Sequence, residues 1–226
     1  MSQAQVRDAG HGTSVSLAEK AYQILVRKIT RLELAPGALL AEKVLMADLG
    51  IGRTPIREAL QRLAIEGLVS HLPNRGMFVA EISATSVQQI YEFRGLIEGF
   101  TARLAATRGS EEEIAELYRL HSQLAQATAE NDIDHYVSLD HRFHQLLARA
   151  SRNSYLEEVV PRIFNQHLRL WFYIANKTGD WHGTAHAHDE MTDSVVNAIS
   201  RRQPEAAEAA MKDYITRRHR DMKDLL

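Results

Sequence analysis

Residues 41–80 constrain the fold of this chain more than any other stretch, because helical patterns, glycine breaks and short extended runs follow one another closely there. Residues 41–49 can form a short helix, which Gly50-Ile51-Gly52 would end. Thr54 and Pro55 can start a second helix, with Thr54 as its N-cap and Pro55 in the first helical position. The order predicts two helices joined by a tight turn.

The second helix is predicted to end near Glu66 and to have one apolar and one polar face. Its apolar residues recur at helical spacing and should face a core: Ile56, Leu60, Leu63 and Ala64. Polar residues are left on or near the outer face toward the N-terminal end: Arg53, Thr54, Arg57 and Gln61. A helix-turn-helix presents this end to base edges, so these residues are candidate DNA contacts.

Two short extended runs, 68–72 and 77–80, follow on either side of Pro73-Asn74-Arg75-Gly76. Proline, asparagine and glycine favour a turn, so the runs predict a β-hairpin wing with Arg75 at its tip. A lone helix-turn-helix pattern also occurs in ordinary core helices. Here the wing, the glycine turn and the arginine placement agree on a DNA-binding module.

The stretch GRTPIREAL, followed by L-x-x-EGLV and then NRGMFVA, resembles the winged helix-turn-helix of the GntR family of bacterial transcription regulators. The motifs occur in the family's order and with compatible gaps. One residue departs from the pattern, because Gly52 stands where a serine usually precedes the first arginine. This departure removes at most one phosphate contact, since a backbone N–H can still serve there.

The resemblance implies DNA contacts for the exposed polar residues of this module. Arg53 and Arg57 are expected to reach guanine or phosphate, because arginine presents a planar fork to guanine O6 and N7. Thr54 and Lys43 are expected to contact the DNA backbone. Arg75-Gly76 at the wing tip is expected at the neighbouring minor groove or phosphates. The alternative for any single arginine is a solvated surface charge.

Composition sets the outer bounds of the interpretation. A chain of 226 residues with 45% hydrophobic residues can fill two modest cores. Its apolar runs fall short of the roughly 20 residues that a membrane helix needs, and the start MSQAQVRDAGHGTSVS has no apolar segment of a secretion signal. We therefore expect a cytoplasmic protein with no membrane partner. The absence of cysteine excludes disulfides, thiolate zinc sites and cysteine nucleophiles.

The net charge of −2 divides unevenly along the chain. Residues 1–82 hold ten Lys and Arg against eight Asp and Glu, and the remainder holds 17 against 21. The N-terminal part is therefore slightly basic, as a nucleic-acid partner requires. Affinity for DNA would depend on a few placed cations and on dimerisation.

We predict three segments: a disordered arm over residues 1–16, a winged helix-turn-helix domain over 17–82 and a helical effector-binding and dimerisation domain over 83–226. The first helix begins at Leu17 and should bury one face: Ala21, Ile24, Leu25, Ile29 and Leu32. At the joint between the domains, three hydroxyl residues are candidate caps for the next helix: Ser83, Thr85 and Ser86.

Everything after the joint has a helical pattern, which predicts an antiparallel all-α bundle and a mainly α protein. The expected helices are residues 87–108, 111–129, 132–150, 155–175, 185–200 and 204–224. A polar stretch over 176–183 is predicted as a loop. Such a bundle can build a ligand pocket from side chains on facing helices.

The segments YEFRGLIEGFTARLAA, DHRFHQLLARASRNSYL and EAAEAAMKDYI resemble, in this order, the FCD effector domain of the FadR subfamily of GntR regulators. The resemblance covers most of residues 87–220. It implies a bundle of six or seven helices that binds a small organic acid, or in some members an acyl cofactor. The binding event would be passed to the two DNA-binding domains of a homodimer on a pseudo-palindromic operator.

Many members of this group hold a divalent metal, of the zinc or nickel class, with one Asp and three His. Asp140 and His144 match the first two positions, and their i, i+4 spacing directs both to one point in the bundle. Thr192 and Tyr214 stand at the other two positions, and neutral hydroxyls replace imidazole poorly. His188, one turn before Thr192, is the predicted substitute.

The same residues could act without a metal. Asp140 and His144 could form a hydrogen-bonded pair inside the bundle. His144 and Tyr214 could donate to a ligand, with Arg94 as the cation for a carboxylate. Arg94 could instead pair only with Glu98, its i+4 neighbour.

The histidine-rich segment WHGTAHAHDEM could suggest a second metal site, but a polar loop leading into a helix does not bring four ligands together. We expect no independent site there, and His182 and His186 are less well placed than His188. Trp171-Phe172-Tyr173 is expected in the core. His167 and Arg169 receive no role.

The sequence as a whole predicts a ligand-responsive transcription regulator, with repression relieved by the effector. One alternative is an architectural DNA binder without an effector. Another is a metal-dependent hydrolase that uses Asp140 and His144, but its protein ligands are incomplete and no general base is evident.

Overall fold

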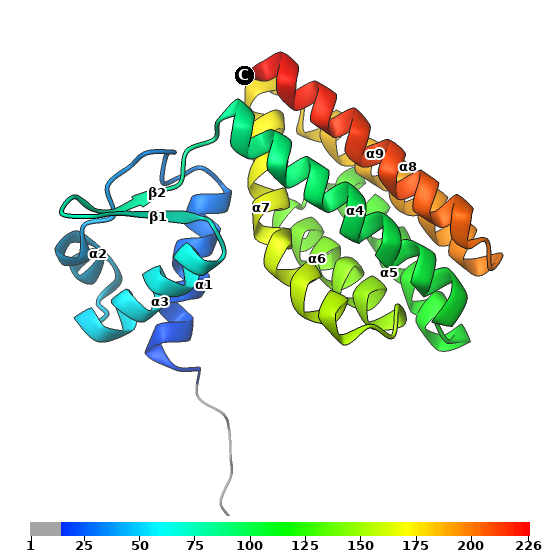
Figure 1. The fold of residues 1–226 in the computed structure, drawn as a ribbon, viewed down its shortest axis with the longest axis horizontal. Helices are drawn as coiled ribbons and strands as arrows, with labels where there is room; N and C mark the ends of the chain where they lie inside the picture. Colours follow the sequence, from blue (N-terminus) through cyan, green and yellow to red (C-terminus); the bar gives the residue numbers. More distant parts are fainter. Residues whose placement is uncertain (1–14) are drawn as a thin grey trace, which may run out of the picture.

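The computed structural model describes residues 15–226, as an N-terminal module beside a helical bundle (Figure 1). The predicted disordered arm lies outside the described residues, apart from Val15 and Ser16. The N-terminal module contains three helices and a two-stranded antiparallel sheet: α1 (Leu17–Thr30), α2 (Glu42–Leu49), α3 (Arg53–Ile65), β1 (Val69–Leu72) and β2 (Gly76–Val79). The predicted winged helix-turn-helix is confirmed.

Helix α1 forms the back of the module and packs on α3. Three of its five predicted core residues are fully buried, whereas Ile24 and Leu32 are only half-buried. Leu32 lies beyond the end of the helix at Thr30, in a left-handed conformation (φ 62°). Tyr22 and Val26 complete the buried face instead.

The turn between α2 and α3 depends on two glycines. Gly50 ends α2 with a φ of 63°, a left-handed conformation that favours glycine. The prediction that Thr54 caps the next helix is wrong, because α3 already begins at Arg53 with Gly52 at the N-cap. No described side chain caps α3, so its first N–H groups remain available to an anion.

The wing is a hairpin with Leu72 opposite Gly76, so Arg75 lies at its tip as predicted. The sequence did not predict its third partner. Leu39 forms a bridge with Phe78, and the Leu40 N–H donates to the Met77 carbonyl at 2.8 Å. This pairing fixes the wing to the segment that enters α2.

The bundle of the described residues consists of six helices: α4 (Ala84–Arg108), α5 (Glu111–Glu130), α6 (Ile133–Ala150), α7 (Ser154–Thr178), α8 (Trp181–Ser200) and α9 (Pro204–Leu225). Ser83, one of the three candidate caps, begins α4 with a capping box. Helices α4 and α9 run side by side along one face (Figure 1). None of the described helices is long and apolar enough to cross a membrane.

The predicted loop over 176–183 is largely helical. Helix α7 continues to Thr178, and only Gly179 and Asp180 separate it from α8. The Asp180 carboxylate accepts a hydrogen bond from the Gly183 N–H at 2.7 Å and so starts α8 early. The histidine-rich segment therefore forms the first turns of α8, which directs its histidines to different sides of a helix.

Candidate functional site

The exposed end of α3 carries two arginines that share one partner. The Nε atoms of Arg57 and Arg53 lie 3.3 and 3.7 Å from the two carboxylate oxygens of Glu42 on α2. The arginine side chains are 60% and 67% exposed, so solvent screens these ion pairs. Both guanidinium groups can therefore turn toward a duplex at little cost.

The other predicted DNA contacts are also on the surface of the N-terminal module. Exposed positions on α2, α3 and the wing hold them: Lys43, Thr54, Gln61, Arg75 and Gly76. Together with Arg53 and Arg57 they give the module cations, hydroxyl and amide groups for phosphate and base edges.

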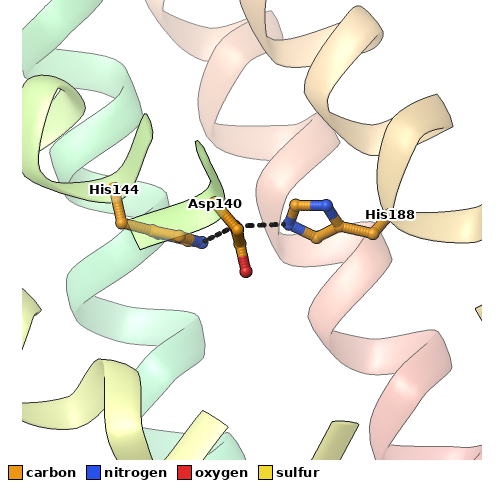
Figure 2. Close-up of side chains that lie close together, drawn as sticks. All are labelled: Asp140, His144 and His188. Carbon is orange, nitrogen blue, oxygen red and sulfur yellow. Dashed lines mark ion pairs between the residues drawn. The ribbon is translucent and has the colours of Figure 1, made fainter. Parts of the chain in front are cut away.

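Three predicted site residues meet inside the bundle (Figure 2). Asp140 and His144 lie on α6 and His188 on α8, and each is at most 3% exposed. The Asp140 Oδ1 atom lies 3.2 Å from His188 Nε2 and 3.4 Å from His144 Nε2. The three atoms do not complete aligned hydrogen bonds with one another. This is a donor set of one carboxylate and two imidazoles around one point, with lone pairs still available.

The charges in this cluster follow from burial and from the ion pairs. Burial alone would raise the pKa of Asp140, but His188 and His144 outweigh it and hold the pKa of the carboxyl well below its usual range. Burial lowers the pKa of His144, but the Asp140 carboxylate overcompensates and the net shift is upward. Asp140 is therefore an anion between two imidazoles, where a divalent cation could replace protons.

The orientation of His188 is fixed by a second contact. Its Nδ1 atom lies 2.8 Å from the Tyr136 hydroxyl, so its Nε2 atom faces Asp140. A partner on the far nitrogen is the usual way in which proteins orient a metal-binding imidazole.

Two further predicted residues have unpaired polar atoms in the bundle interior. Arg94 on α4 is 1% exposed, and its Nε and Nη2 atoms donate to Glu98 at 2.6 and 3.2 Å. The Arg94 Nη1 atom and the Tyr214 hydroxyl on α9 have no hydrogen-bond partner among the described residues. Arg94 therefore pairs with Glu98 and still keeps a free donor.

His167 on α7 was not predicted to take part, yet it borders this cluster. Its ring centroid lies 5.6 Å from that of His144 and 6.2 Å from that of His188. The side chain is buried, its Nδ1 atom is unpaired, and burial together with Arg94 holds its pKa well below the usual range. The sequence did contain a signal that His167 is buried, because it continues the apolar face of α7 at helical spacing from Phe164 and Trp171.

Other predicted candidates point elsewhere. The Thr192 hydroxyl donates to the Asp189 carbonyl at 2.9 Å and lies 2.9 Å from His121 Nδ1 on α5, so its bonds are already made. His182 and His186 are exposed on α8. Of the α8 histidines, His188 is the buried one that meets Asp140.

Helix α7 also contacts the N-terminal module directly. The Asn165 amide donates to the Tyr22 hydroxyl and to the Glu66 carboxylate, both at 3.0 Å. The Gln166 amide donates to the Glu66 carbonyl at 2.7 Å, and Arg169 donates to the Ala80 carbonyl. Residues 165–169 of α7 therefore form hydrogen bonds with the C-terminal end of α3 and with the residue that follows β2.

Comparison with known proteins identifies the family. Residues 17–79 match the family described as bacterial regulatory proteins, gntR family, and residues 89–217 match the FCD domain. The chain belongs to the GntR family. This regulator is 30% identical over 172 residues to the Nta operon transcriptional regulator of Aminobacter aminovorans, across 76% of this chain and 79% of the relative.

A second relative is also similar in sequence, and two solved structures share the fold. The GntR-family chain is 35% identical over 131 residues to the HTH-type transcriptional repressor RspR of Escherichia coli, which is 58% of either protein. The structure of E. coli McbR/YncC has a TM-score of 0.78 at 22% identity and covers 93% of this chain and 99% of its own. A regulator from Rhodococcus sp. RHA1 has a TM-score of 0.73 at 23% identity, covering 92% and 98%. At these identities the solved structures support the fold alone.

Proposed function

We propose that this GntR-family regulator is a cytoplasmic repressor of the FadR subfamily that binds a pseudo-palindromic operator as a homodimer. A small organic acid, held in the bundle beside a divalent metal, would change its affinity for the operator. The observation that carries the proposal is the position of α7, which lies between the buried polar cluster and the DNA-binding module. The relative RspR carries the name of a repressor.

The proposed DNA contacts divide by chemistry. Arg53 and Arg57 extend from the open end of α3, where a helix-turn-helix meets base edges in the major groove. Lys43, Thr54 and Arg75 suit phosphate oxygens. With a charge balance of only +2 in the first 82 residues, the phosphate contacts would set most of the salt dependence.

We expect Arg57→Ala to weaken operator binding by about 1–3 kcal/mol if the guanidinium reads a base, and to weaken binding to random DNA much less. Fluorescence anisotropy on both duplexes, at one salt concentration, measures the difference. The matched control is Arg119→Ala, because Arg119 is an exposed arginine on α5 of the effector domain. Equal losses on operator and random DNA would instead assign Arg57 to phosphate.

The effector would enter the buried cluster through its unpaired donors. A carboxylate can accept from the Arg94 Nη1 atom and the Tyr214 hydroxyl, both of which lack partners. Asp140, His144 and His188 fit a divalent ion of the zinc or nickel class, because their unpaired ligand atoms lie within 4.8 Å of one another. Such an ion would supply a positive centre for the acid.

The coupling to DNA would pass through α7. The side chains of the cluster are all buried, so an acid that binds there would contact α4, α6, α8 and α9 from inside the bundle. Because Asn165 and Gln166 hold Glu66 at the end of α3, a shift of α7 changes how the DNA-binding module is held. The effector needs different affinities for the DNA-competent and DNA-incompetent arrangements.

The first test is a thermal-shift screen of small carboxylic acids on the metal-loaded protein, before and after chelation, with operator binding measured alongside. A specific acid should raise the melting temperature, since ligand at 100 times its Kd stabilises by about 2.7 kcal/mol, and should release the operator. Chelation should weaken the acid's effect. An acid shift that survives chelation would remove the metal from the proposal and retain Arg94 and Tyr214.

Two rival functions give different results in the same screen. An architectural DNA binder would show neither a shift nor a change in operator affinity with any acid. A metal-dependent hydrolase would turn over a small ester or phosphate, and His144→Ala would abolish that turnover.

A further inference from the structure

We propose that a small carboxylate with an apolar body binds in the cavity between α7 and the segment that joins the wing to α4, with Arg169 as its counter-ion. The site is separate from the buried cluster around Asp140, because the residues that line the cavity include no member of that cluster. The proposal therefore depends neither on a metal ion nor on an effector inside the bundle.

The cavity lies where the two domains meet. Its volume is about 710 Å³, within the range of small-molecule sites. The end of α3, strand β1, residues 80–83 and the facing sides of α4 and α7 all contribute to its wall. Branched aliphatic side chains form much of that wall: Ile65, Ile82, Ile90, Val159, Ile163 and Leu170. Such a wall favours a ligand that buries a hydrocarbon or aryl group.

Arg169 supplies a buried positive charge in the same cavity. It is 2% exposed, and its Nη2 atom donates to the Ala80 carbonyl. Its Nε atom has no hydrogen-bond partner among the described residues. Burial lowers the pKa of the guanidinium to about 10, and the Glu81 carboxylate opposes that effect only in part. An anion in the cavity would satisfy the free donor with a charge-assisted hydrogen bond.

The other charges around the cavity favour a single negative charge on the ligand. Arg162 lines the cavity two turns before Arg169, but its side chain is 59% exposed and pairs with Glu158 at 2.6 Å. Solvent screens that pair, so Arg162 adds little. Glu66 and Glu81 also line the cavity and would repel a dianion such as phosphate. One buried cation beside an apolar wall fits a monocarboxylate.

An occupant of this cavity would contact both domains at once. It would lie against α7 and against residues 80–83, which connect β2 to α4. Its carboxylate would lie beside the bond from Arg169 to the Ala80 carbonyl. Binding would therefore favour the arrangement in which the DNA-binding module is docked on α7, which gives the cavity a route to operator affinity.

The test is isothermal titration of the full-length protein with naphthoate, an aryl carboxylate, and with naphthamide, its neutral isostere. We expect naphthoate to bind at one equivalent per chain and naphthamide to bind at least 10-fold more weakly. Arg169→Gln should weaken naphthoate binding by about 10–100-fold, the value of one charge-assisted hydrogen bond. Arg169→Lys retains the charge and should recover part of that loss.

Two further variants separate the cavity from its surroundings. Ile163→Trp fills the cavity from a half-buried position on α7 while Arg169 stays in place, and it should abolish binding. Arg162→Gln is the matched control on the same helix and should weaken binding less than about threefold, because its charge is already screened.

Four results would overturn the proposal. They are a wild type that does not bind naphthoate, wild-type affinity in Arg169→Gln and Ile163→Trp, and a loss in Arg162→Gln as large as that in Arg169→Gln. The fourth is binding that survives Arg169→Gln but disappears when Arg94→Met is combined with Glu98→Leu, because the ligand would then occupy the bundle. That result would support the proposed effector site, whereas loss through Arg169 alone leaves the bundle site to its own screen.

Discussion

Glu98→Ala is expected to lower the free energy of unfolding by about 3–5 kcal/mol, because it leaves the Arg94 guanidinium buried without its counter-ion. Arg94 is 1% and Glu98 2% exposed, and the Nε to Oε1 distance is 2.6 Å. Taking a charge out of water is costly, and inside the bundle the ion pair with Glu98 offsets that cost. Urea denaturation followed by circular dichroism measures the loss.

A double replacement separates the charge from the packing. Arg94→Met combined with Glu98→Leu removes both charges and retains much of the volume, so it should recover most of the stability that Glu98→Ala loses. As an exposed control, Glu205→Ala breaks a solvent-screened pair with Arg103 and should cost less than about 1 kcal/mol. A similarly small loss for Glu98→Ala would contradict the isolation of Arg94 from water.

The double variant also tests the role of Arg94 in ligand binding. It should fold and bind DNA, yet lose the thermal shift produced by any acid that needs the Nη1 donor. Retained acid binding would show that the guanidinium serves only the pair with Glu98. The sequence left these two roles open for Arg94, and the structure combines the pair with a spare donor.

Local patterns predicted most of the fold. The spacing of Ile56, Leu60 and Leu63 correctly predicted which side of α3 is buried. Gly50, in a left-handed conformation, ends α2 where the sequence indicated. These features depend on neighbours within a turn or two. The errors at Thr54 and over 176–183 have the same origin, because the residue that starts a helix was misplaced by a few positions.

The sequence predicted the part of the candidate site whose residues lie close together on one helix. It did not predict the residues that α7 contributes. Asp140 and His144 share one helix face, so their proximity follows from the i, i+4 rule. Whether α7 faces α6 and α8 depends on how distant helices pack. That packing brings His167 to the cluster and Asn165 to Glu66, and no short-range pattern encodes it.

Phe100→Glu is expected to convert the regulator to a monomer and to weaken operator binding by about 10²–10⁴-fold, because each module would bind its half-site without the avidity of a pair. Three large apolar side chains lie exposed on one stripe of α4: Phe93 (45%), Leu96 (67%) and Phe100 (44%). Large apolar side chains that gather on an exposed face of a folded protein indicate a contact surface. A second copy of this chain is the occupant that the operator symmetry of the proposed function requires.

Analytical ultracentrifugation and operator titration test the prediction together. Tyr118→Glu is the control, because Tyr118 is an exposed aromatic residue on α5, and it should leave both the dimer and the affinity intact. A dimer of wild-type affinity in Phe100→Glu would exclude this stripe of α4 as the interface. A monomeric Phe100→Glu variant can be compared with the wild type on a single half-site. Equal affinity there would mean that the loss on the full operator comes from avidity alone. The α4 stripe would then contribute to DNA binding only by joining two copies.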